Sequence, residues 1–443
     1  MAQEERPGHR GRLTGAEVFI REAFNIPVTM VRQYAGPNSI RRRKLRWINE
    51  MLTHSRERVP YYRQDDRYHI GPITDLAQLE RLPVLEKAVL RERPTEDLLA
   101  EGIDLDTCRR FQTSGSTGHR VTVWHDAVTH DYHMAACFRR FAATRAYRPT
   151  DRLTHIRPYA APERGFEKLK LFRRHQILSH LPMEQIKAEL LGNRPHVLAG
   201  QPVHVREVLR ALTTDELTQL RRTLRMVLTE SELLTPEHRA RLVEGYGVPV
   251  FDEYSAFEIL NIYFECSKGG KHLAEDRIHV EVLDDDGNSL PDGQEGRLVI
   301  TPYMERAMPL VRYAIGDIGV IGTEPCGCGR KFRTLELTVG RANDFIVLPS
   351  GKQLYPDTFV WFAAIHDGID ECFVHQNADG SVRISIVPAA HVTDVNEVFD
   401  SVRKEMFRLA GHEFDLELVT AEKLPLTVGG KGKFITSEYP GES

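Results

Sequence analysis

Residues 113–120 read Thr-Ser-Gly-Ser-Thr-Gly-His-Arg, a stretch in which hydroxyl side chains alternate with glycines. Glycines allow a loop to pass close to phosphate groups, and the backbone N–H and side-chain O–H groups can then donate to phosphate oxygens. The stretch is not a Walker A loop, because it lacks the Gly-Lys-Ser/Thr ending which that loop requires. On its own it also fits an exposed flexible turn, so its interpretation depends on the rest of the chain.

Four later segments carry side chains that can act on a nucleotide. In chain order they are Asp-Glu-Tyr-Ser-Ala-Phe-Glu (252–258), Arg-Tyr-Ala-Ile-Gly-Asp (312–317), Gly-Arg-Ala-Asn-Asp (340–344) and Leu-Pro-Leu-Thr-Val-Gly-Gly-Lys (424–431). The first places a carboxylate four residues after an aromatic ring. The second ends in an acid that can accept hydrogen bonds from two ribose hydroxyls, and the others supply a cation and a glycine-flanked lysine. Each segment alone also fits a surface turn, whereas all of them in one order point to a nucleotide site.

Length and composition limit the classes of protein that fit. At about 150 residues per domain, 443 residues predict two or three domains. Hydrophobic residues at 41% and charged residues at 28% exclude wholesale disorder and fibrous repeats. The net charge of -4 argues against a nucleic-acid partner, and we interpret the basic run 41–44 as a solvated helix face. No stretch reaches the roughly 18 apolar residues of a membrane span, and the polar start at 1–12 predicts a cytoplasmic protein.

Periodicity predicts the elements of the fold. Apolar positions at helical spacing predict a helix over 40–58 that ends before Pro60, since proline bars the preceding residue from helical geometry. Leu-rich charged segments predict further helices around 76–102, 184–191 and 202–226, and strands are predicted at 279–283 and 298–301. Alternating strands and helices predict an α/β fold with mixed sheets.

The pattern of the last hundred residues predicts a second, smaller domain. Residues 382–387 and 414–419 alternate as strands do, and 393–410 have an amphipathic helical pattern. We expect a small α+β domain over 343–443, a large domain over 1–342, and a flexible tail at 1–15.

Together these segments resemble the adenylate-forming superfamily of acyl-CoA synthetases, adenylation domains and luciferases. Local sequences at 58–63 (Arg-Val-Pro-Tyr-Tyr-Arg), 194–202 and 265–276 are similar to the shorter phenylacetate–CoA ligase branch. The resemblance covers about residues 40–435. It implies a large adenylate-forming domain with a mobile C-terminal lid domain, and an AMP-forming ligase that adenylates a carboxylic acid with ATP and Mg²⁺.

The resemblance also implies roles for individual residues. The β- and γ-phosphates would be held by Ser114, Gly115, Ser116, Thr117 and Gly118. The rest of the nucleotide would be bound by Tyr254, Asp317 and Arg341. The acyl pocket would be lined by Tyr159, Tyr254, Ser255, Ala256 and Phe257. Glu258 would coordinate Mg²⁺, because a hard cation prefers carboxylate oxygen. Lys431 would bridge the substrate carboxylate and the α-phosphate, where charge gathers in the transition state.

The sequence departs from the family pattern at several positions. The loop has His119 where a lysine is usual, Phe257 stands where a hydroxyl is usual, the hinge acid appears as Asn343, and the acyl-binding stretch reads Arg157–Arg164 without its glycines. We expect an aromatic acid as substrate and CoA as acceptor. The alternatives are an acceptor other than CoA (an amine, a carrier-protein thiol or an inorganic nucleophile such as nitrite) and a non-catalytic nucleotide-binding relative. A homodimer is one compatible assembly.

Four residues from two segments form a candidate metal site. Cys266 and His272 lie six residues apart, and Cys326 and Cys328 flank one glycine. Three thiolates and one imidazole are a tetrahedral zinc set, and a chain with six cysteines is too poor in cysteine for a disulfide framework. We expect structural zinc, and the alternative is a group of buried free cysteines beside a hydrogen-bonded histidine.

Overall fold

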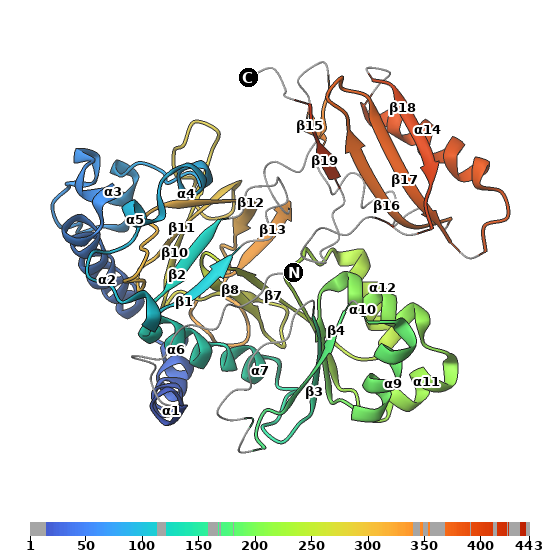
Figure 1. The fold of residues 1–443 in the computed structure, drawn as a ribbon, viewed down its shortest axis with the longest axis horizontal. Helices are drawn as coiled ribbons and strands as arrows, with labels where there is room; N and C mark the ends of the chain where they lie inside the picture. Colours follow the sequence, from blue (N-terminus) through green and yellow to red (C-terminus); the bar gives the residue numbers. More distant parts are fainter. Residues whose placement is uncertain are drawn as a thin grey trace.

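The structure, a computed structural model, describes residues 15–112, 121–157, 167, 170–179, 181–339, 346–348, 353–354, 368–389, 391–410, 414–422, 424 and 435–439. These residues form an α/β fold that contains one seven-stranded sheet and two four-stranded sheets (Figure 1). Within the described ranges no helix is long and apolar enough to cross a membrane.

The seven-stranded sheet has the order β4-β3-β5-β6-β7-β8-β9. Its strands are β3 (Leu153–Arg157), β4 (Arg174–Leu178), β5 (Val197–Gly200), β6 (Met226–Glu230), β7 (Val250–Ala256), β8 (Leu260–Glu265) and β9 (Lys271–Leu273). The strands from β4 to β7 are parallel to their neighbours, whereas β8 and β9 are antiparallel. The carboxyl ends of the parallel strands therefore meet at one edge, where ligands bind in open α/β sheets.

Helices cover both faces of this sheet, as buried parallel strands require. One face packs on α9 (Met183–Asn193), α10 (Pro202–Ala211), α11 (Thr214–Arg221) and α12 (Pro236–Tyr246). The other face packs on α7 (Phe138–Thr144), which follows α6 (Ala127–Ala136). Leu198 of β5 faces the first group, while Val197 and Ala199 face the second. This alternation follows from the two-residue period of a strand.

The second sheet is an antiparallel meander with the order β10-β11-β12-β13. Its strands are β10 (Ile278–Leu283), β11 (Glu295–Pro302), β12 (Tyr313–Ile321) and β13 (Leu335–Val339), and the short pair β1 (Arg109–Gln112) and β2 (Thr122–His125) packs against the same core. The N-terminal helix α1 (Gly15–Arg32) packs on α6 and on the core of the seven-stranded sheet, whereas α2 (Pro37–Arg58) and α3 (Pro60–Arg63) lie at the side of the meander. Tyr62 ties these helices to the sheet, because its hydroxyl donates to the carbonyl of Pro309 at 2.8 Å.

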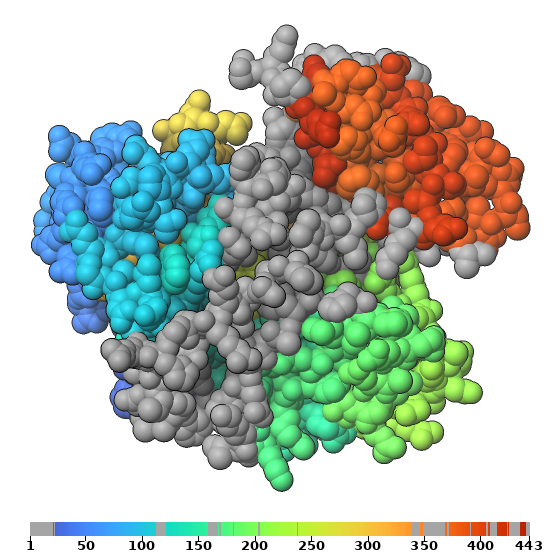
Figure 2. Space-filling view, viewed as in Figure 1, coloured from blue at the N-terminus to red at the C-terminus, as the bar shows by residue number. Residues whose placement is uncertain are grey.

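The C-terminal residues form a unit with its own core (Figure 2, orange to red). The sheet order is β18-β17-β16-β19, with β16 (Ile369–Gln376), β17 (Val382–Pro388), β18 (Leu416–Thr420) and β19 (Ile435–Ser437). Helix α14 (Val395–Ala410) connects the parallel strands β17 and β18. The α+β character expected for this part is confirmed, while the expected boundary at 342/343 lies outside the described residues.

Most predicted elements are confirmed, but two expectations were wrong in part. Residues 76–102 are helical only in short pieces, a 3₁₀ turn (Leu76–Arg81), α4 (Lys87–Glu92) and α5 (Thr95–Leu98), because prolines interrupt them and Leu85 forms a β-bridge to Tyr313. In the basic run 41–44, Lys44 is not solvated: it is 3% exposed and pairs with the buried Glu275.

Candidate functional site

Glu258 lies at the tip of a tight hairpin between β7 and β8. Ala256 pairs with Leu260, so the loop contains three residues, and Leu260 adopts a left-handed conformation with φ of 65°. Leu260 is the first residue of β8, so this uncommon conformation closes the loop. A hairpin tip is ordinarily exposed, yet Glu258 is only 4% exposed because the loop inserts against β12 and the first residue of α4.

Two groups hold the carboxylate of Glu258. Nζ of Lys87, the first residue of α4, lies 2.9 Å from Oε1, and the hydroxyl of Tyr313 donates to the same oxygen at 3.1 Å. Burial opposes ionisation of Glu258, but the charge and hydrogen bond of Lys87 outweigh it and lower the pKa of the carboxyl. Glu258 is therefore an anion at neutral pH, as a ligand of a hard cation must be.

Asp317 projects from an irregular part of β12. The register with β11 shifts between Arg297 and Val299, and Gly316 has φ of 91°, a conformation that favours glycine. Such bulges re-aim side chains and are common beside active sites. The hydroxyl of Tyr254 donates to Oδ2 of Asp317. The structure thus brings Tyr254, Asp317 and Glu258, from two motifs some sixty residues apart, to one side of the β7–β8 hairpin.

Aromatic rings surround the expected acyl-pocket residue Phe257. Its ring stacks on Phe111 of β1 with centroids 5.8 Å apart and an interplanar angle of 27°. Phe111 in turn stacks on His130 of α6 at 6.2 Å. Ser255 and Ala256 precede Phe257 at the end of β7 and are partly buried. An apolar, aromatic surface therefore lies next to Glu258.

Several predicted site residues lie outside the described part of the chain. They are Ser114, Gly115, Ser116, Thr117, Gly118, Tyr159, Arg341 and Lys431. Their assignments stay predictions.

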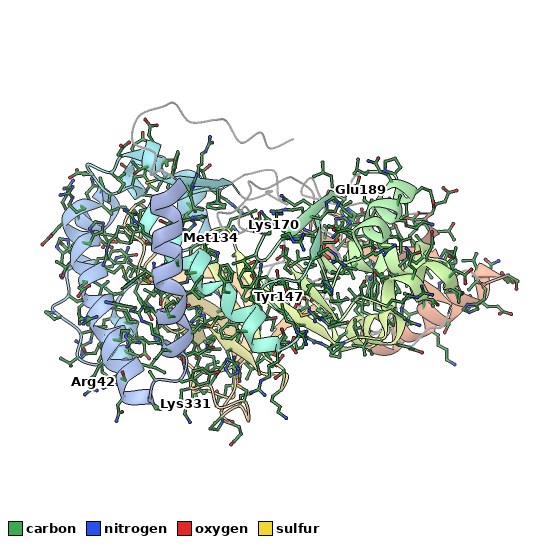
Figure 3. All side chains as sticks on the ribbon, turned by 90° about the horizontal axis from the view of Figure 1, so that it is seen from below. Arg42, Met134, Tyr147, Lys170, Glu189 and Lys331 are labelled. Carbon is green, nitrogen blue, oxygen red and sulfur yellow. The ribbon has the colours of Figure 1, made fainter. Side chains whose placement is uncertain are left out.

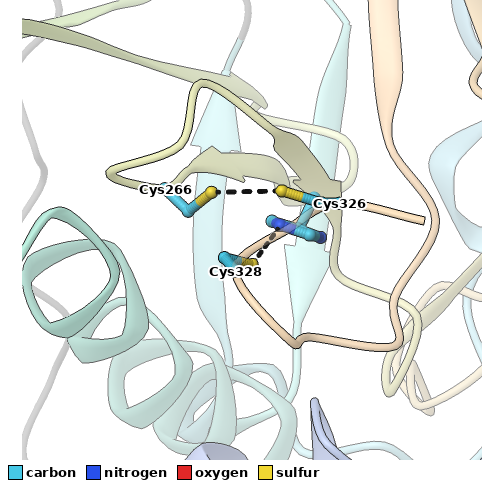
Figure 4. Close-up of side chains that lie close together, drawn as sticks. Cys266, Cys326 and Cys328 are labelled. Atoms are coloured by element: carbon cyan, nitrogen blue, oxygen red, sulfur yellow. Dashed lines mark hydrogen bonds between the residues drawn. The ribbon is translucent and has the colours of Figure 1, made fainter. Parts of the chain in front are cut away.

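The four metal-site candidates converge (Figure 4). Their ligand atoms all lie within 4.8 Å of one another. Sγ of Cys266 is 3.6 Å from Sγ of Cys326, which excludes a disulfide, and Sγ of Cys328 is 3.2 Å from Nε2 of His272. In a tetrahedral zinc site two thiolates lie about 3.8 Å apart, and a thiolate and an imidazole nitrogen about 3.5 Å. These two distances are therefore close to those of a tetrahedral metal site.

The surroundings of the cluster also suit a metal. Nδ1 of His272 lies 2.9 Å from the carbonyl oxygen of Phe332, and donation to that carbonyl leaves Nε2 free to face the thiols. A side chain at Gly270 would place Cβ 2.6 Å from Sγ of Cys326, so the turn needs glycine. The cysteine segment also reaches the N-terminal helices, because the N–H of Lys331 donates to the carbonyl of Gln33 at 2.7 Å. Figure 3 shows Lys331 near the ends of these helices.

Sequence reasoning missed several residues at this site. Lys87 carries no recognisable signal, since it is one of many cations in a charged segment. Tyr313 lies within the quoted 312–317 motif, but its reach to Glu258 depends on how two sheets pack. Both contacts join residues more than fifty positions apart.

The chain is similar in sequence to characterised ligases. It is 28% identical over 335 residues to the phenylacetate-coenzyme A ligase of Thermus thermophilus, covering 71% of this chain and 74% of that enzyme. It is 24% identical over 397 residues to the enzyme of the same name from Aromatoleum evansii, covering 84% and 87%. No family model matches.

Solved structures share the fold. A 2-hydroxyisobutyryl-CoA ligase, captured after adenylation with an acyl-AMP, superposes with a TM-score of 0.76 at 17% identity, covering 92% of this chain and 91% of that one. The anthranilate CoA ligase AuaEII with anthranoyl-AMP gives a TM-score of 0.56 at 15% identity, covering 75% and 67%.

Proposed function

This chain is a phenylacetate–CoA ligase-like member of the adenylate-forming superfamily, and we propose that it activates a carboxylic acid with ATP and transfers the acyl group to CoA. The observation that carries this proposal is the buried, ionised Glu258 beside Asp317 and Tyr254. These groups offer a cation ligand and a ribose acceptor at one place, which adenylation requires.

The reaction has two steps. An oxygen of the acid attacks the α-phosphorus of ATP, the bond to the β-phosphate breaks, and pyrophosphate leaves with the electron pair. The CoA thiolate then attacks the acyl carbonyl and expels AMP. The protein's task is to position the reactants and to stabilise charge, since little covalent chemistry is required of it. Mg²⁺, when bound, would neutralise phosphate charge.

Lys87 has a place in this scheme. Its ammonium group donates to Oε1 of Glu258, the same carboxylate oxygen that a metal ion would bind. Lys87 is 29% exposed at its side chain, so it can turn towards bound phosphates when a cation takes its place. It would then supply positive charge that the loop, with His119 in place of lysine, lacks.

We propose an aromatic acid as the substrate. Support comes from the rings of Phe111, Phe257 and His130 beside Glu258 and from the names of the relatives. We further propose that residues 343–443 form a mobile domain that brings Lys431 to the first step and turns away for the second.

A pyrophosphate-exchange screen over a panel of acids tests the first step. Aromatic acids should stimulate exchange and aliphatic acids of the same charge should not. AMP release with and without CoA, compared with amines, a carrier-protein thiol and nitrite, identifies the acceptor. If AMP release depends on another nucleophile, that nucleophile is the acceptor in place of CoA. If the protein binds ATP but no acid supports pyrophosphate exchange, a non-catalytic relative is favoured.

Asp317→Ala should weaken ATP binding about tenfold to a hundredfold. The paired, charge-assisted hydrogen bonds that a buried carboxylate accepts from ribose hydroxyls contribute about 1.5–3 kcal/mol. Calorimetric titration with ATP measures the change, and Asp286→Ala, in the exposed turn after β10, is the matched control. Unchanged affinity in the Asp317 variant would contradict the ribose assignment.

We also propose a structural zinc ion held by Cys266, His272, Cys326 and Cys328. The supporting observation is the pattern of distances, together with the carbonyl that orients the imidazole. The ion would tie the β8–β9 turn to the loop after β12. All four protein ligands are present, so no open position for a substrate is implied.

Cys328→Ser should reduce the zinc content from about one equivalent to well below half, because a structural site depends on its full ligand set. The melting temperature should fall with the metal, while ATP affinity should change little. Metal analysis of purified protein makes the measurement. Cys108→Ser, whose thiol faces the carbonyl of Asp104, should retain the metal. Wild-type protein with little zinc would end this assignment.

A further inference from the structure

His125 ends β2 and lies directly behind the hairpin that carries Glu258. It is 2% exposed. Asp126, the next residue, caps α6 by accepting from the N–H of Thr129 at 3.0 Å and also accepts from the N–H of Arg306 at 3.1 Å. The position of the imidazole is therefore fixed by the strand before it and the helix after it.

Both ring nitrogens of His125 face acceptors. Nε2 is 2.8 Å from the carbonyl oxygen of Phe257, and Nδ1 is 2.9 Å from Oε1 of Glu305. A carbonyl oxygen only accepts hydrogen bonds, so Nε2 must carry a proton. Neither neutral tautomer suits both neighbours, because each would direct one lone pair at an oxygen. The doubly protonated ring suits both.

Glu305 supplies the matching charge. It is 1% exposed, and no described residue makes a well-aligned hydrogen bond to either carboxylate oxygen, so its contact with Nδ1 is an ion pair. A buried carboxylate needs a neighbouring cation. His125 is in contact with it, and Arg277 lies near enough to interact with its charge.

Arg277 holds the other side of the same hairpin. Its Nη2 donates to the carbonyl of Ile259 at 2.8 Å and to that of Asn261 at 3.2 Å. The carbonyls immediately before and after Glu258 thus each accept from a buried side chain, His125 on one side and Arg277 on the other. Glu305 interacts with both cations.

We propose that His125 is a positioning residue for Glu258: as an imidazolium ion paired with Glu305, it holds the carbonyl of Phe257 and so fixes the hairpin tip. It also contacts the edge of Phe111, with ring centroids 5.3 Å apart, and so supports the aromatic surface against Phe257. The catalytic consequence rests on the proposed function, whereas the protonation state and the rigidity of the hairpin do not.

The electrostatic surroundings agree with this geometry. Burial opposes the charged ring, and Arg277 does too, but Glu305 and the bond to Phe257 outweigh them and raise the pKa of His125. His130 and His133, the nearby titratable rings on α6, have their pKa values lowered by burial and are neutral. Because the pKa of His125 is higher in the folded protein than in the unfolded chain, its protonation stabilises the fold. This stabilisation is complete at pH values below the unfolded pKa of about 6.5, and it is lost as the pH rises through the folded pKa.

Three variants test the proposal in the full-length protein. His125→Leu removes the donor and the charge, and it should lower kcat of pyrophosphate exchange at least tenfold with a smaller change in KM for ATP. His125→Gln combined with Glu305→Gln keeps a donor for Phe257 and removes both charges of the ion pair, while Asp276 remains as a counter-charge for Arg277. It should restore most of kcat. In the wild type kcat should fall as pH rises through the pKa of His125, and in this double variant it should not. His175→Gln is the control, because His175 pairs with Glu189 at 3.2 Å on the surface.

Two further measurements do not depend on activity. In histidine-labelled protein, the resonance absent from His125→Gln should report a ring protonated at both nitrogens at pH 7, and a singly protonated ring would overturn the proposal. Amide exchange at 257–261 should rise in His125→Leu and not in His175→Gln. Equal exchange in both variants would also overturn it. Absence of pyrophosphate exchange in the wild type, with these two results as expected, would remove the proposed function and leave the positioning role intact.

Discussion

Glu258→Gln is expected to reduce acid-dependent pyrophosphate exchange by about a hundredfold or more. A bound metal ion supplies several kcal/mol of charge stabilisation, and each 1.4 kcal/mol or so corresponds to a factor of ten in rate. The amide keeps the shape of the side chain and can still accept from Tyr313, but it no longer attracts a cation. The saturating rate and the Mg²⁺ concentration at half-activation should both change.

The fold should survive this change, since Lys87 is partly exposed and can be solvated without its partner. A melting curve checks this point. Glu86→Gln is the matched control: Glu86 precedes Lys87 and forms an exposed pair with Arg297 at 2.9 Å. An unchanged rate or an unchanged Mg²⁺ requirement in Glu258→Gln would contradict its role as a cation ligand.

Lys431→Ala is expected to slow the same exchange about 10²–10³-fold. A positive charge placed where the pentacoordinate α-phosphorus gains its extra charge acts on the transition state, and loss of one such donor costs about 2.7–4 kcal/mol. The change should appear mainly in kcat, with a smaller effect on apparent affinity for ATP. Initial rates across ATP and acid concentrations separate the two.

The second half-reaction gives a sharper test of Lys431. If the small domain turns away after adenylation, the variant should convert a supplied acyl-adenylate and CoA to thioester at nearly the wild-type rate. Equal damage to both half-reactions would contradict the rotation. An undamaged first half-reaction would contradict the catalytic role of Lys431.

The sequence predicted what local patterns control. The helix that ends before Pro60, the strands at 279–283 and 298–301 and the small α+β unit follow from periodicity and from proline geometry. The broken segment 76–102 did not follow, because Leu85 leaves the helical pattern to pair with Tyr313, more than two hundred residues away. No local signal reports such a bridge.

The residues of the candidate site also fall into two groups, those that the sequence predicted and those that it did not. Glu258, Asp317 and the four metal-site residues stand in short motifs whose residue types indicate their chemistry. The residues that hold the Glu258 hairpin carry no such signal: Lys87, His125, Glu305 and Arg277 are ordinary charged residues in the sequence. Their importance arises from burial beside the hairpin, and burial between two sheets depends on the whole topology.

The tie between Gln33 and the cysteine-bearing loop has a consequence for synthesis. The side chain of Arg330 donates to the side chain of Gln33, 297 residues earlier in the chain. Likewise, the hydroxyl of Tyr62 donates to the carbonyl of Pro309, which is synthesised 247 residues later. Ribosomes add about 5–20 residues per second, so the N-terminal helices are exposed for about 15–60 s before their partners exist. During that interval the apolar face of α2 lacks its partners Tyr303 and Val311, and a chain truncated before residue 303 should aggregate.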